Sequence, residues 1–137
     1  MRLLDSEIRL SASDLSNHLG CRHLTWLDLR AATGEIEPPD HHDPRLEALI
    51  ERGFQHEAAF LDHLEGKGRA VTRLPKADDT TSGTQQTIAA MQAGAGVIVQ
   101  ATLTSGRWLG YADVLLRVET PSDLGGWSYE VLDTKLA

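Results

Sequence analysis

Tyr129-Glu-Val-Leu-Asp133-Thr-Lys135-Leu-Ala137 ends the sequence, and its β-type composition predicts a strand over residues 128–136. Side chains alternate between the two faces of a strand, so Asp133 and Lys135 are expected on one face, roughly 6–7 Å apart. A carboxylate beside an ammonium suits a site that binds a divalent cation and cleaves phosphodiesters. The alternative is a surface ion pair on an edge strand.

A second aspartate lies in the run Gly110-Tyr-Ala-Asp113-Val-Leu-Leu, within a strand expected over residues 108–119. Asp113 has apolar neighbours and is expected to be partly buried. If the two strands are neighbours, Asp113 and Asp133 could share one cation. Strict alternation assigns Trp108, Ala112, Val114 and Leu116 to one face, and Tyr111, Asp113, Leu115 and Arg117 to the other.

A helix is predicted from Pro44 to Glu65, because proline suits a first turn and the following glycine suits the stop. Its apolar residues follow helical spacing and place Glu57 inside the apolar stripe, with His56 at the edge. A carboxylate on a buried stripe is costly unless it is paired or metal-bound. Glu57 could instead pair with an arginine such as Arg117, and His56 could be a surface histidine.

The remaining pattern indicates an α/β (α+β) fold with a mixed sheet flanked by helices. Helices are expected after Ser11, which can cap a helix start, and over residues 21–32 and 84–93. Further strands are expected over residues 69–74 and 96–103, with a hairpin turn at residues 104–107. The whole chain is interpreted as one domain, with a helical segment over residues 1–43 and a core over residues 44–137.

The composition sets limits on the class of protein. The chain has 137 residues and a net charge of −7, which argues against a passive nucleic-acid binder but not against a nuclease with clustered carboxylates. No apolar run is long enough to span a membrane, and the charged N-terminal residues predict a cytoplasmic protein. Cys21 is the only cysteine and is interpreted as a small buried hydrophobic residue.

Three motifs in this order resemble the RecB-like branch of the PD-(D/E)XK nuclease superfamily. They are Gly53-Phe-Gln-His56-Glu57 on a helix, Gly110-Tyr-Ala-Asp113 on a strand and Asp133-Thr-Lys135 on the next strand. The segment from Ser11 to Thr25 is similar to the N-terminal part of such nucleases, which occur alone or fused to DNA helicases. The resemblance implies a restriction-endonuclease-like core.

The same resemblance implies a deoxyribonuclease that hydrolyses DNA phosphodiester bonds in DNA processing or repair, beside a helicase. Mg²⁺ or Mn²⁺ would be bound by Asp113 and Asp133, with His56, and Glu57 as an optional further ligand, completing the shell. Lys135 would be the catalytic lysine. Some relatives bind an iron–sulfur cluster through four cysteines. With Cys21 alone, no such cluster is expected here.

Family members continue past the D-x-K strand into a helix with a Q-x-x-x-Y motif, whereas this sequence ends two residues after Lys135. A C-terminally incomplete core is therefore expected. Two other functions stay open: a catalytically degenerate module that acts as a scaffold for a helicase or another partner, and a hydrolase of small phosphate esters.

Overall fold

The computed structural model describes residues 1–4, 6–39, 44–77 and 79–132. Both helices and strands occur in these ranges, and the predicted class, a mixed sheet flanked by helices, is confirmed. In chain order the elements are β1 (Arg2–Leu4), β2 (Glu7–Arg9), α1 (Ala12–Gly20), α2 (Arg22–Ala32), α3 (Pro44–Gly66), β3 (Val71–Arg73), α4 (Thr80–Gln92), β4 (Val97–Ser105), β5 (Trp108–Val118) and β6 (Ser128–Leu132).

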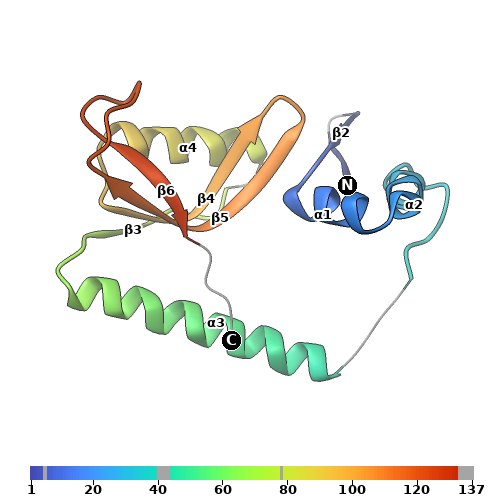
Figure 1. Cartoon of the computed structure of the whole chain (residues 1–137), viewed down its shortest axis with the longest axis horizontal. Helices are drawn as coiled ribbons and strands as arrows, with labels where there is room; N and C mark the ends of the chain where they lie inside the picture. The colour runs from blue at the N-terminus through green and yellow to red at the C-terminus, as the bar shows by residue number, and fades with distance from the viewer. Residues whose placement is uncertain (5, 40–43, 78, 133–137) are drawn as a thin grey trace. The chain divides into compact units, whose positions relative to one another are not determined.

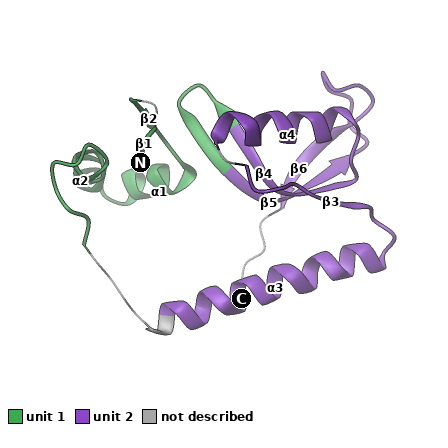
Figure 2. Cartoon of the chain, turned by 180° about the vertical axis from the view of Figure 1, so that it is seen from behind, with its two compact units in different colours: residues 1–42, 104–110 green, residues 43–103, 111–137 purple. Residues whose placement is uncertain are grey.

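The chain divides into two compact units (Figure 2). Unit 1 comprises residues 1–42 and 104–110, and unit 2 comprises residues 43–103 and 111–137. In unit 2 the strands lie in the order β3-β4-β5-β6. β3 and β4 are parallel and joined through α4, whereas β5 and β6 are antiparallel. Helix α4 covers one face of this sheet and α3 lies along the other (Figure 1).

The face of the sheet toward α3 is closed by aliphatic side chains. Leu61 and Leu64 of α3 are buried in one cluster with strand residues Val97, Val99 and Val114. Val97 and Val114 are fully buried. The predicted stripe of α3 therefore faces the sheet in the C-terminal half of the helix. In its N-terminal half, Leu46, Leu49, Ile50 and Phe54 are about half exposed or more.

The face toward α4 depends on an irregularity in β4. Ile98 and Ala101 both pack in the cluster on this side, although regular alternation would pair Ile98 with position 100. Between them Gln100 has a φ of 60°, in the left-handed region. One extra residue that shifts the alternation is the pattern of a β-bulge. Through this shift Ala101 joins Ile98 on the side of α4.

The shifted end of β4 is held by a side chain of α4. The backbone N–H of Thr102 donates to Oγ1 of Thr87 at 2.9 Å, and the Thr87 hydroxyl donates to the carbonyl oxygen of Gly83 at 3.0 Å. Thr87 is 1% exposed. Gly83 is needed at this contact, since a Cβ there would lie 2.7 Å from Oγ1 of Thr102. The helix thus supplies a hydrogen bond to the bulged strand.

Unit 1 contains an antiparallel β1–β2 hairpin followed by α1 and α2. Ser11 caps α1 as predicted: its side chain accepts a bond from the N–H of Asp14, and the Asp14 carboxylate accepts from the Ser11 N–H at 2.7 Å. The N-terminal ammonium of Met1 also bonds the Asp14 carboxylate. Leu10 exchanges backbone bonds with the tip of the β4–β5 hairpin, at Arg107 and Leu109.

The boundaries of most elements match the prediction, with two differences. The β1–β2 hairpin was not predicted, because its short strands carry charges where an apolar alternation would be expected. Helix α4 begins at Thr80 rather than Thr84, because Asp79 caps it by accepting a bond from the N–H of Ser82 at 2.8 Å. Among the helices that the structure describes, none is long and apolar enough to cross a membrane.

Replacing Thr87 by valine keeps the volume of the side chain but leaves the N–H of Thr102 without its buried acceptor. We expect the free energy of unfolding to fall by about 1–3 kcal/mol, measured by urea denaturation. Thr81→Val is the control, because Thr81 is on the same helix and exposed. Equal stability of the two variants would show that the bond to Thr102 contributes nothing.

A second expectation concerns Asp14 and pH. Burial alone would raise the pKa of Asp14, but the bonds from the N-terminal ammonium and Ser11 outweigh it and lower the pKa below 3.8. Because the folded-state pKa is the lower one, the ionised carboxylate stabilises the fold above the unfolded-state pKa. That contribution is lost as the pH falls through the folded-state value.

Asp14→Asn should therefore cost about 1–2 kcal/mol of unfolding free energy at neutral pH. The difference from the wild type should shrink below pH of about 4. Denaturation curves across this range test the expectation, with Asp123→Asn on the exposed loop as the matched charge control. A pH-independent difference would contradict the assigned role of the charge.

Candidate functional site

Glu57 lies on the face of α3 that meets the sheet. It is half-buried and precedes Leu61 by one helical turn, and Leu61 packs in the cluster that contains Val114. The side chain of Gln100, from the bulge of β4, reaches it: Nε2 donates to Oε1 of Glu57 at 2.9 Å. The prediction that Glu57 lies within the apolar stripe is confirmed. The partner that the structure gives it is a neutral amide.

His56 is exposed, although it neighbours Glu57 in the sequence. Successive helical residues point about 100° apart, so two neighbours cannot both face the sheet. The exposure pattern thus selects Glu57 as the residue of this motif that is turned toward the strands. His56 as a metal ligand stays a prediction.

Asp113 is half-buried on β5, as predicted. The predicted alternation around it is only partly right, because Ala112 packs with Leu115 on the α4 side while Val114 packs on the α3 side. Asp113 therefore lies where the alternation of β5 changes, directly beside a buried residue of the Leu61 cluster. A strand irregularity of this kind redirects side chains relative to a regular ladder.

The β4–β5 hairpin relates Asp113 to Gln100. The strands are neighbours in the sheet, and the turn between them lies at residues 106–107. Gln100 and Asp113 are equally many residues away from this turn, so they lie at about the same level of the hairpin. Because Gln100 also bonds Glu57, the amide links the helix that carries Glu57 to the hairpin that carries Asp113.

The pairing of β5 with β6 leads to the third acidic motif. The antiparallel register pairs Val118 with Ser128 and continues to Val114 opposite Leu132. Asp113 is the next residue on β5, and Asp133 follows Leu132 in the sequence. Asp133 and Lys135 themselves lie outside the described residues. The two strands that lead to Asp113 and Asp133 are therefore neighbours, as the sequence predicted.

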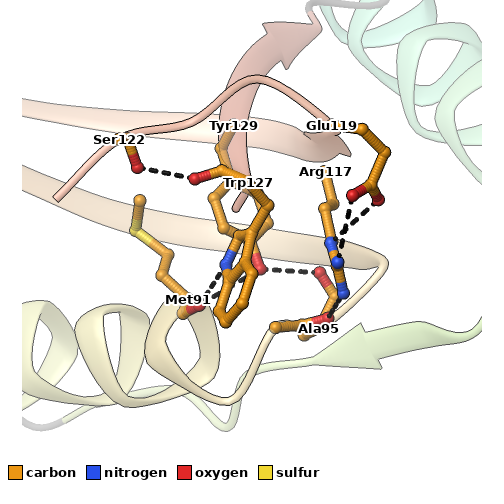
Figure 3. Close-up of polar contacts among 8 residues, drawn as sticks. Met91, Ala95, Arg117, Glu119, Ser122, Trp127 and Tyr129 are labelled. Carbon is orange, nitrogen blue, oxygen red and sulfur yellow. Dashed lines mark hydrogen bonds and ion pairs between the residues drawn. The ribbon is translucent and has the colours of Figure 1, made fainter. Parts of the chain in front are cut away.

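Strand β6 is fixed to the end of α4 by polar contacts of two aromatic residues (Figure 3). Nε1 of Trp127 donates to the carbonyl oxygen of Met91 at 3.1 Å, and the Tyr129 hydroxyl donates to that of Ala95 at 2.8 Å. Burial raises the pKa of Tyr129 above 10.0, partly offset by the charge of Arg117. Tyr129 thus remains a hydrogen-bond donor at neutral pH, and these bonds set the path of the strand that leads to Asp133.

Arg117 belongs to this same cluster and not to Glu57 (Figure 3). Its guanidinium lies 4.7 Å from the ring centroid of Trp127 and donates to the carbonyl oxygen of Gly94 at 3.2 Å. Nη2 bonds Glu119 at 3.3 Å, and Nε lies 3.2 Å from the same carboxylate at an angle unsuited to a hydrogen bond. The suggested pairing of Glu57 with Arg117 is therefore wrong.

The metal-ligand residue types near the N-terminus have other contacts. Nδ1 of His18 lies 2.8 Å from the hydroxyl of Thr25, and the His23 ring stacks on Trp26. Cys21 is exposed, so its interpretation as a buried hydrophobic residue is wrong. It lies between the end of α1 and the start of α2. Among the described residues, no cluster of three histidine, cysteine or carboxylate side chains is arranged to hold a metal ion. The polar segment His41-His42-Asp43 lies outside them.

The two described carboxylates fit a hard divalent cation by their chemistry. Mg²⁺ prefers oxygen ligands, keeps several of its waters and is commonly bound through one or two carboxylates. Glu57 and Asp113 are both half-buried, which suits a ligand that has to reach an ion near the surface. Glu57 is bonded through Oε1, and a carboxylate offers further acceptor positions on its second oxygen.

Gln100 is the residue of this region that sequence reasoning missed. Its one signal is a polar amide in the middle of the apolar run Val97-Ile-Val-Gln100-Ala-Thr-Leu. A polar residue in a strand that is buried on both faces indicates a bulge or a functional contact.

A scan against protein-family models and searches of curated proteins and of solved structures found no match to this chain.

Proposed function

We propose that this chain is a metal-dependent deoxyribonuclease domain of the RecB-like branch of the PD-(D/E)XK superfamily, with a restriction-endonuclease-like core. The observation that carries the proposal is the β5–β6 register, which runs to Val114 opposite Leu132. The next residues in the sequence beyond this pair are Asp113 and Asp133. The mixed sheet with a helix on each face is compatible with such a core.

Asp113, Asp133 and Glu57 would hold Mg²⁺ or Mn²⁺, with His56 as a further predicted ligand. When bound, the ion supplies Lewis-acid polarisation of the phosphate and a lower pKa for its waters. Asp113 and Asp133 would fix its place, and their carboxylates should approach within about 6 Å if they share one ion. Lys135 contributes a positive charge where negative charge develops on the phosphate in the transition state.

The wider proposal is a role in DNA processing or repair beside a helicase, in the cytoplasm. It rests on the order of the three motifs and on their placement. The first lies on α3 and the second on β5, and the third begins directly after β6.

The acidic residues and the lysine should have separable effects. We expect Asp113→Asn to abolish Mn²⁺ binding and Mg²⁺-dependent DNA cleavage together. Lys135→Met should keep Mn²⁺ affinity within a few-fold and slow cleavage by about 100- to 1,000-fold, because its charge acts mainly in the transition state. Isothermal calorimetry and cleavage of linear DNA measure the two quantities.

The matched controls are Asp123→Asn and Lys67→Met, which make the same changes at exposed positions. Full activity of Lys135→Met would refute its catalytic role. Cleavage confined to small phosphate esters would favour the alternative hydrolase. A chain that binds no Mn²⁺ and cleaves neither substrate would contradict the nuclease and favour the scaffold.

A further inference from the structure

We propose that Gln100 is a positioning residue that holds the Glu57 carboxylate ready for the cation. The inference rests on the proposed function, since it assigns Glu57 to the metal shell. It adds a residue outside the three motifs, from the strand that precedes Asp113 in the hairpin.

The backbone of Gln100 has an uncommon conformation. A φ of 60° is uncommon for a residue with a side chain and is normally left to glycine in the interior of a strand. Strained conformations of this kind persist where surrounding structure enforces them, and they cluster at functional sites. Here the residues on both sides, Val99 and Ala101, are buried, while Gln100 itself is exposed. The bulge directs one polar side chain out of the apolar segment 97–101.

The side chain of Gln100 is bonded to Glu57. Nε2 of Gln100 donates to Oε1 of Glu57 across 43 residues of sequence. An amide donor orients a carboxylate without neutralising its charge, whereas an arginine or lysine would neutralise it. A fixed carboxylate that keeps its negative charge is what a cation site requires, and partners that orient ligands in this way tune metal affinity.

Gln100 lies on the strand next to the one that carries Asp113. It lies at about the same level of the hairpin as Asp113, on the neighbouring strand. The amide therefore connects the helix that carries Glu57 to the part of the sheet that carries Asp113. Loss of this connection would remove the hydrogen bond that fixes the orientation of the Glu57 carboxylate.

The test replaces Gln100 by glycine and by methionine in the full chain. Gln100→Gly removes the side chain and the backbone strain, and Gln100→Met keeps length and strain but removes the donor. We expect both to lower Mn²⁺ affinity by about 10-fold or more in isothermal calorimetry. In EDTA, the melting temperature of Gln100→Gly should be unchanged or higher, because glycine adopts this φ readily.

Gln55→Ala is the matched control, because Gln55 donates to Glu51 at 3.0 Å on the exposed side of the same helix. It should leave Mn²⁺ affinity unchanged. A double-mutant cycle adds a readout that a structural role would not change: in the Glu57→Ala background, Gln100→Met should have no further effect on Mn²⁺ affinity.

The outcomes separate this inference from the proposed function. Wild-type affinity in both Gln100 variants, with Mn²⁺ still bound, would overturn the positioning role alone. An equal loss from Gln100→Met with and without Glu57 would also overturn it. A wild-type chain that binds no Mn²⁺ would overturn both proposals.

Discussion

The shift of alternation at Gln100 is the constraint on which unit 2 depends. The sheet has a helix on each face, so β4 must present apolar side chains in both directions. Val97 and Val99 pack toward α3, while Ile98 and Ala101 pack toward α4. The bulge interrupts the strand, and Thr87 of α4 supplies an acceptor to the N–H of Thr102. The irregular residue thereby determines which side chains of β4 pack toward α4 beyond position 100.

The two faces of the sheet differ in how their polar groups are satisfied. On the α4 side, Trp127 and Tyr129 bond backbone carbonyls and Arg117 pairs with Glu119. Each of these polar groups has a hydrogen-bond partner within the fold. On the α3 side, Glu57 receives its bond from a neutral amide. A chain that places an arginine in the first cluster and a glutamine in the second retains negative charge where the proposed cation would bind.

Much of this arrangement is predictable from the sequence, and the exceptions share a physical cause. The span of α3, the capping role of Ser11 and the place of Asp113 follow from periodicity and local hydrogen bonding, which a sequence displays directly. The shift at Ala112 and the left-handed Gln100 depend on contacts between distant segments. The suggested Glu57–Arg117 pair is wrong for the same reason. The Arg117 guanidinium contacts Trp127 and the carbonyl oxygen of Gly94, which are distant from it in the sequence.

The net charge of −7 gives the neutral partner of Glu57 a wider consequence. An acidic chain repels the phosphates of DNA, and half-buried carboxylates such as Glu57 and Asp113 add to that repulsion locally. A bound divalent cation reverses the local field, because it is the largest charge in such a site. If Glu57 were neutralised by arginine, less negative charge would remain to attract the ion. The amide of Gln100 therefore links the backbone irregularity of β4 to the negative charge that the proposed cation site would need.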